Sequence, residues 1–254
     1  MIGYKIGCRK ERIIFAFCVA GLFFFTQAHR WMNDMVGDDF FNGMSNGQIL
    51  AYALQDGYFG LVEQMNVNTA VAVILCEYLL GRGDLTCMLR FSSRREYLLS
   101  RFIVICVVEV GMAVLFMSVG IGYLIPNFSK NLLSCQSVIF FLSGIGFSAL
   151  HYIKTAVIYM IFRDLLNRKI IAMLVTVSIF LFLFFIYIDS LLGFIIPANY
   201  LPFLDLCIPY ELYIGQASFL DAGFRVVRQI GVVLIGVFIW ERIWERKDVL
   251  ELEK

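Results

Sequence analysis

The sequence predicts an all-α protein that lies in a membrane and crosses it six times. Three observations lead to this fold class. Hydrophobic residues make up 60% of the 254 residues and charged residues only 16%, and the mean hydropathy is +0.80. A water-soluble domain of this length could not bury so much apolar surface in one core. Long apolar stretches recur along the chain, and lysine and arginine gather between alternate stretches.

Each predicted span is a stretch of about 20 mostly apolar residues, the length that crosses a bilayer at about 1.5 Å per helical residue. We place the spans at residues 13–28, 61–80, 102–125, 138–162, 170–188 and 224–243. Together they predict one transmembrane domain over residues 1–254. The first stretch is short and follows a basic segment, so a cleaved signal peptide is its alternative interpretation.

Basic residues orient membrane helices because segments rich in lysine and arginine stay on the cytoplasmic side. These residues collect before the first span, between the second and third, between the fourth and fifth, and after the sixth. They are Lys5, Arg9, Lys10, Arg12, Arg82, Arg90, Arg94, Arg95, Arg101, Arg163, Arg168, Lys169, Arg242, Arg246 and Lys247. The intervening segments are poor in positive charge, and residues 189–223 have no lysine or arginine. Both termini are therefore expected in the cytoplasm.

Two of the outer segments are more than turns. Residues 48–60 carry apolar side chains at helical spacing, which predicts a short helix on the outer leaflet. Residues 191–220 are apolar, but Pro197, Pro202 and Pro209 prevent a straight helix. Because free backbone groups cannot face lipid, we expect broken or re-entrant helices packed against protein between the fifth and sixth spans.

A basic, glycine-broken segment over residues 77–101 joins the second and third spans. Its candidate functional residues are Glu77, Gly81, Gly83, Leu85, Met88, Leu89, Ser93, Arg94, Arg95 and Arg101. The leucines and the methionine form an apolar ridge at i, i+3 and i+4, and the Arg94 and Arg95 side chains can meet acidic partners or lipid phosphates. An ordinary cytoplasmic loop without a partner is the alternative.

This segment and the arrangement of spans resemble the type-2 ABC exporter permease family, the membrane subunit of bacterial ATP-driven exporters. The family's threonine after glycine and proline before Ser-Arg are replaced here by Arg82 or Asp84 and by Ser92. The resemblance implies that the segment is a coupling helix that docks on a separate ABC ATPase. It also implies a dimer with a second copy or a homologous permease, a bacterial cytoplasmic (inner) membrane location, and export of a peptide, antibiotic or lipid-like cargo.

The sequence has no G-x-x-x-x-G-K-[ST] motif, so this chain has no P-loop for ATP. We expect no cofactor in this chain, with ATP and magnesium held by the partner ATPase. We also expect contact with membrane lipid, none with nucleic acid, and no enzymatic activity of its own. The seven cysteines form no C-x-x-C pair, although a disulfide between Cys135 and Cys207 is conceivable.

Three ionisable residues, Glu109, His151 and Lys154, fall inside predicted spans. A charge at the bilayer centre costs about 2.5 to 3.5 kcal/mol on an insertion scale, so these side chains should be paired. Counting about 1.5 Å per residue puts Glu109 and Lys154 at similar depth, and we expect an ion pair between them with His151 beside it. A structural clamp is the simpler interpretation of this pair.

Other function classes stay open. Glu109, His151 and Lys154 could serve a proton-coupled secondary transporter. A membrane-embedded enzyme is a further alternative, but the sequence lacks H-E-x-x-H and a pair of intramembrane aspartates. At the outer end of the sixth span, Arg225 and Arg228 are expected to snorkel, with an outer gate as the alternative.

Overall fold

The computed structural model describes residues 10–36, 44–55, 58–60, 63–80, 91–125, 135–191 and 202–246. These residues are helical almost throughout and contain no strand, as predicted. In chain order the elements are α2 (Lys10–Arg30), η1 (Trp31–Val36), α3 (Asn46–Gln55), η2 (Glu63–Asn68), α4 (Thr69–Leu80), α6 (Arg94–Leu124), α7 (Cys135–Leu166), α8 (Lys169–Leu191), η5 (Pro202–Cys207), α9 (Ile208–Tyr213) and α10 (Phe219–Arg246).

Among the described residues, 5 helices are long and apolar enough to cross a membrane: α2, α6, α7, α8 and α10. They coincide with the first, third, fourth, fifth and sixth predicted spans. The second predicted span is different, because it divides into a polar π-helical turn, η2, and the apolar helix α4. A membrane protein is therefore supported, and the sixth crossing stays a prediction.

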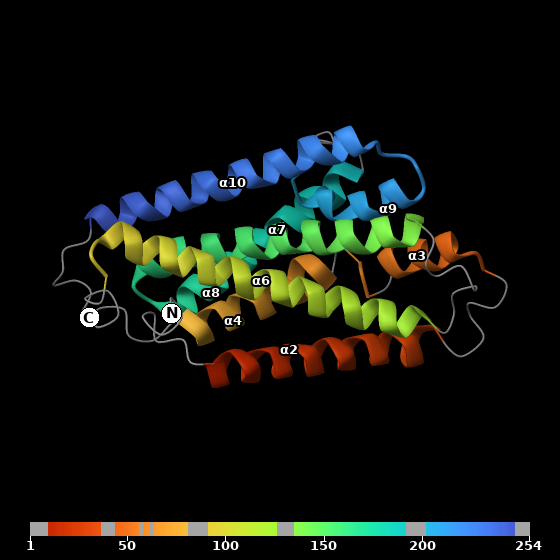
Figure 1. The fold of residues 1–254 in the computed structure, drawn as a ribbon, viewed down its shortest axis with the longest axis horizontal. Helices are drawn as coiled ribbons and strands as arrows, with labels where there is room; N and C mark the ends of the chain where they lie inside the picture. Colours follow the sequence, from red (N-terminus) through yellow and green to blue (C-terminus); the bar gives the residue numbers. More distant parts are fainter. Residues whose placement is uncertain are drawn as a thin grey trace.

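The long helices lie side by side, with α7 at the centre of the bundle (Figure 1). Helices α4, α6, α8, α9 and α10 all pack on α7. In the most apolar stretch of α7, 67% of the residues are buried, against 17% in the corresponding stretches of α8 and α10. The outer helices turn large apolar side chains such as Phe182, Phe185 and Phe224 away from the protein. Those phenylalanines are therefore placed to face lipid.

The predicted basic flanks gather at one end of the bundle. Helices α2, α6 and α8 begin at this end, and α4, α7 and α10 end there (Figure 1). We call it the basic end, because Arg94, Arg163, Lys169 and Arg246 all belong to it. This clustering agrees with the positive-inside pattern, and the side of the membrane that the basic end faces stays a prediction.

The segment between α2 and α6 is broken in the middle of the bundle. Helix α3 lies at the end opposite the basic end, and η2 and α4 continue from the interior toward the basic end (Figure 1). The turn at Tyr58 and Phe59 is buried, and its backbone groups have partners. The Phe59 N–H donates to the Ala53 carbonyl (2.9 Å), and the Phe59 carbonyl accepts from the Gln64 amide (2.8 Å). Irregular backbone at membrane depth is stable only when protein satisfies it in this way.

This arrangement refines two expectations about the segment. The predicted helix over residues 61–80 is described over 63–80, where the π-helical turn η2 continues directly into α4 and buries Gln64 and Asn68. The expected amphipathic helix exists as α3, but its apolar face, including Ile49, Leu50 and Ala53, is buried against protein. Helix α3 packs on α9, where a Cβ on Gly47 would lie 3.4 Å from the Tyr213 ring.

Between α8 and α10, the described part of the chain forms two short helices, η5 and α9, both packed on α7. Pro202 begins η5 and Pro209 lies in the first turn of α9, so the prolines start helices here and interrupt none. The segment is broken as predicted. Pro197 lies outside the described residues, and re-entry into the membrane stays a prediction.

Candidate functional site

Glu77 joins three helices at the basic end. Its carboxylate pairs with Arg163 Nε (2.9 Å) on α7 and with Lys169 Nζ (2.8 Å) at the start of α8, and it accepts a hydrogen bond from the Tyr159 hydroxyl (2.7 Å). Hydrogen bonds between charged groups are roughly twice as strong as neutral ones. Glu77 therefore fastens the end of α4 to α7 and α8.

Arg101, the last residue of the predicted coupling segment, is fully buried on α6. Its guanidinium donates to the Leu80 carbonyl (3.3 Å) and to the Tyr97 hydroxyl (3.0 Å). It also lies 5.4 Å from the centre of the Tyr97 ring and 5.8 Å from that of Trp240, within range of cation–π attraction. Because Leu80 ends α4, Arg101 caps that helix and links it to α6 and α10.

Asp164 anchors α10 on α7. One carboxylate oxygen accepts hydrogen bonds from the indole N–H groups of Trp240 and Trp244, each at 2.6 Å, and the other lies 3.4 Å from Arg163 Nη1. Sequence analysis did not single out Asp164. The signal in the sequence was a pair of tryptophans one turn apart at positions 240 and 244, together with an aspartate at the end of the fourth predicted span.

The start of α6 is fixed by its own cap and by α10. The Ser93 hydroxyl accepts from the Glu96 N–H (3.1 Å) and caps the helix. Arg94 donates to the Trp244 carbonyl (3.2 Å), and Arg95 pairs with Glu241 (3.2 Å) while its side chain stays 84% exposed. Of the predicted coupling residues, the structure describes Glu77, Ser93, Arg94, Arg95 and Arg101, and it makes the contacts of Glu77 separate from those of Arg94 and Arg95. The others, Gly81, Gly83, Leu85, Met88 and Leu89, lie outside the described residues.

The expected ion pair between Glu109 and Lys154 is wrong. Lys154 Nζ donates to the Gln229 side chain on α10 (2.9 Å). Glu109 instead lines a space next to α4, and neither of its carboxylate oxygens has a hydrogen-bond partner among the described residues. Helix α6 presents Glu109 to α4, whereas α7 presents Lys154 to α10.

His151 turns in a third direction, toward α4 and α8. Its Nε2 lies 3.2 Å from the Thr69 hydroxyl, and its ring meets Phe180 edge-on with centres 5.3 Å apart. Within the described part of the chain no hydrogen bond connects His151 with Glu109 or Lys154. The three side chains therefore face three different sets of neighbours.

A second charged cluster lies near the opposite end, around the buried carboxylate of Asp205 on η5. Asp205 pairs with Arg228, lies 3.7 Å from Arg225 Nη1, and accepts from the Gln229 amide (2.7 Å). Because Gln229 also accepts from Lys154, the cluster connects η5, α10 and α7. Arg225 and Arg228 therefore face the buried Asp205 carboxylate, and their role at the outer end stays a prediction.

Cys207, at the end of η5, is a free thiol in the structure. Burial, reinforced by the negative charge of Glu211, raises the pKa of Cys207 to about 12, so the thiol is protonated at neutral pH. The side chain of Cys135, its conceivable disulfide partner, lies outside the described residues.

Residues 43–47 read Gly-Met-Ser-Asn-Gly, the G-x-S-x-G pattern of many serine hydrolases, which sequence analysis overlooked. Ser45 makes different contacts here. Its hydroxyl donates to the Gln48 side chain (3.0 Å) and lies 3.4 Å from the Gln48 N–H, at the start of α3. The pattern therefore caps a helix, and among the described residues Ser45 has no histidine partner.

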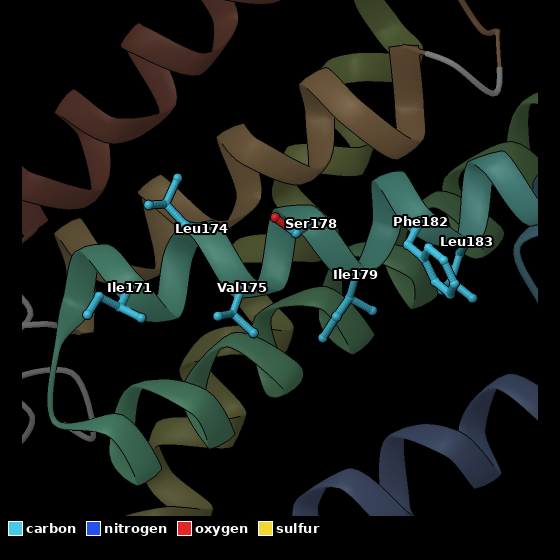
Figure 2. A pocket seen from close by; sticks show the side chains of 7 residues that line it. All are labelled: Ile171, Leu174, Val175, Ser178, Ile179, Phe182 and Leu183. Carbon is cyan, nitrogen blue, oxygen red and sulfur yellow. The ribbon is translucent and has the colours of Figure 1, made fainter.

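A shallow groove runs along α8. Figure 2 shows its lining, which is apolar apart from Ser178 and includes Ile171, Leu174 and Phe182. These three side chains are among the exposed large apolar groups of the molecule. The groove suits lipid acyl chains and carries no group for chemistry. Within the described ranges, no three His, Cys, Asp or Glu side chains lie together to hold a metal ion.

The likeness to type-2 ABC exporter permeases rests on the coupling segment and on the arrangement of spans. Comparisons with known proteins identify no relative that would support this likeness. The sequence matches no protein-family model, no curated protein and no solved structure.

Proposed function

We propose that this chain is the membrane-spanning permease subunit of an ATP-driven exporter of the ABC type, powered by a separate ATPase. The observation that carries the proposal is the anchoring of both ends of segment 81–90. Before it, the carbonyl of Leu80 is bonded to Arg101. After it, Arg94 and Arg95 hold the start of α6 to α10. A force on this segment would therefore move α4, α6 and α10.

The remaining bonds at the basic end extend this connection. Glu77 ties α4 to α7 and α8 through Arg163 and Lys169, and Asp164 ties α7 to α10. Such charge-assisted bonds resist separation better than apolar contacts, since breaking one leaves a buried charge unpaired. A subunit docked at this end would thus act on every helix that contributes to the network.

The rest of the assembly follows from the same proposal. ATP and magnesium belong to the partner ATPase, because this sequence has no P-loop. A second copy or a homologous permease completes the transport unit in a bacterial cytoplasmic membrane. The cargo is an amphipathic peptide, antibiotic or lipid-like molecule.

The experiment co-expresses this chain, carrying an affinity tag, with the ABC ATPase encoded nearest its gene, and measures ATP hydrolysis in the purified material. The exposed Arg95 is the residue to change, and Arg242, at the same end, supplies the control because it pairs within its own helix with Glu245 (2.7 Å). We expect Arg95→Glu to lose most of the co-purified hydrolysis and Arg242→Glu to keep it.

Two results would contradict the proposal. One is equal co-purified ATPase activity from Arg95→Glu and the unchanged chain. The other is transport by the purified chain alone in proteoliposomes without ATP, which would favour a proton-coupled transporter. The different directions in which Glu109, His151 and Lys154 face count against that alternative.

A further inference from the structure

A groove between α6 and α10 opens near the basic end. The two helices touch there, where Arg94 donates to the Trp244 carbonyl (3.2 Å), and they diverge toward the opposite end (Figure 1). The groove has a volume of about 450 Å³, in the range of ligand sites. Its lining residue Leu99 is 56% exposed, so the groove is open on its outer side. A ligand can therefore enter without any movement of the helices.

The lining of this α6–α10 groove changes from charged to apolar along its length. Its charged side chains, Arg95, Glu96 and Glu241, lie nearest the basic end. Its apolar lining comes from Leu98, Leu99, Val237 and the buried Trp240. A phospholipid has the same order, because its charged headgroup lies at the membrane surface and its acyl chains lie beneath.

The apolar part of the groove continues along α6. Leu99, Ile103 and Val107 are exposed and lie four residues apart, so they share one face of the helix. Buried side chains of α7, Ile153 and Val157, pack between α6 and α10 beside this face. An acyl chain that begins in the groove can therefore follow α6 toward the centre of the bilayer.

The charges of the groove determine which headgroup fits it. Arg95 is the single cation among the described lining residues, and its side chain is 84% exposed. Glu96 accepts a hydrogen bond from the Ser92 N–H (3.0 Å), and Glu241 contacts Arg95 (3.2 Å). One cation and two carboxylates suit a headgroup with one phosphate and one ammonium group. A headgroup that is only anionic would meet more repulsion than attraction.

We propose that the α6–α10 groove binds a glycerophospholipid whose headgroup carries a primary ammonium, as in phosphatidylethanolamine. Arg95 binds the phosphate, and Glu241 accepts hydrogen bonds from the ammonium group. The Arg95–Glu241 pair opens easily for this exchange, because exposed ion pairs contribute little to stability. The proposal requires only that the chain lies in a membrane, and it does not depend on the permease function.

The test is native mass spectrometry of the purified full chain in detergent, with three lipids that have the same acyl chains. They are phosphatidylethanolamine, phosphatidylglycerol and phosphatidylcholine. We expect phosphatidylethanolamine to bind about fivefold more tightly than phosphatidylglycerol, a modest ratio because the charged contacts are exposed to solvent. Phosphatidylcholine should fall between them, since its quaternary ammonium group attracts carboxylates but donates no hydrogen bond.

Three variants separate the contributions to binding. Glu241→Gln removes the partner of the ammonium group and should abolish the preference for phosphatidylethanolamine over phosphatidylglycerol. Arg95→Gln removes the partner of the phosphate and should weaken the binding of all three lipids. Glu245→Gln is the control on α10, because Glu245 pairs with Arg242 and does not line the groove. It should bind lipids like the unchanged chain.

Three results would overturn the proposal. Two of them are equal binding of phosphatidylethanolamine and phosphatidylglycerol by the unchanged chain, and an unaltered preference in Glu241→Gln. The third is a lipid-free dimer that persists in excess lipid, because a second copy of the chain would then cover the groove. Neither ATP nor the ATPase is present, so a failure here is distinct from a failure to co-purify ATPase activity.

Discussion

The carboxylate of Asp164 accepts from two indole groups that lie one turn apart on α10, and its second oxygen faces Arg163. Asp164, Trp240 and Trp244 are all buried. A buried donor that loses its acceptor costs about 1 to 3 kcal/mol. One side chain therefore carries much of the attachment between α7 and α10.

Replacing this side chain by leucine tests the attachment. Asp164→Leu leaves two indole N–H groups without their acceptor and Arg163 without one of its carboxylates. We expect a loss of about 3 to 5 kcal/mol in stability, the usual cost of removing one partner from a buried charged network. The measurement is the midpoint temperature of unfolding in detergent. Glu245→Gln, on the exposed face of α10, is the control and should unfold at the original temperature.

Glu109 should respond in the opposite way. Glu109→Leu removes a carboxylate that bonds to none of the described residues, and leucine suits the aliphatic side chains of Leu79, Leu80 and Ile105 around it. Replacing an unpaired buried polar group by an apolar one of similar size is neutral or stabilising. We expect an unfolding midpoint in detergent at or above that of the unchanged chain. A marked fall would show that Glu109 has a partner in the resting protein.

At the scale of elements, the buried turn between α3 and η2 depends on α6. Tyr58 and Phe59 pack on the α6 surface at Phe116, with the Tyr58 ring stacked 4.7 Å from the Phe116 ring. The Tyr58 hydroxyl donates to the Phe116 carbonyl (3.1 Å). Gly120, one turn further along α6, provides the space for these rings, because a Cβ there would lie 2.6 Å from Tyr58 Cε1.

Two glycines of α6 make a matched pair for this contact. Gly120→Ala forces the buried Tyr58 and Phe59 rings to move, and overpacking of this kind costs about 1 to 3 kcal/mol. Gly122→Ala meets nothing within 4 Å and should be neutral or slightly stabilising, since alanine favours helix. Thermal unfolding of both variants in detergent checks the difference. Equal midpoints would show that the turn does not pack on α6 in the membrane protein.

At the scale of the whole molecule, α7 connects two polar networks along the bundle. Near the basic end it contributes Tyr159, Arg163 and Asp164, and further along the helix it contributes Lys154. Both networks also hold α10. A change at the basic end can therefore reach the Asp205 cluster through two adjacent helices, as a transport cycle requires.

The orientation of the bundle can be tested with two exposed residues. Ser92 lies next to the start of α6 at the basic end, and Gln216 lies between α9 and α10. In a chain whose seven cysteines are changed to serine, a membrane-impermeant maleimide should label Gln216→Cys on intact cells. Ser92→Cys should react only after the membrane is opened. The reverse pattern would put the basic end outside and would remove the basis for an ATPase partner.

Several features could be located from the order of the residues alone. Five helices lie where the apolar stretches predict them, and the residues that flank them put the positive charges at one end. Glu77, Ser93, Arg94, Arg95 and Arg101 were selected as coupling residues, and that role stays a prediction. Length, hydropathy, helix capping and proline placement depend on neighbours along the chain, so these properties were accessible without the fold.

The contacts between helices were not accessible in the same way. Counting residues gave Glu109 and Lys154 similar depth, but the rotation of each helix about its axis decides which neighbour a side chain meets. Helix packing therefore determined that Lys154 bonds Gln229 and that Glu109 faces aliphatic side chains of α4. It also determined that Asp164 accepts hydrogen bonds from two tryptophans. The turn at Tyr58 has local partners for its backbone, but its rings pack on Phe116 of α6 and Phe140 of α7, which no local stretch of sequence specifies.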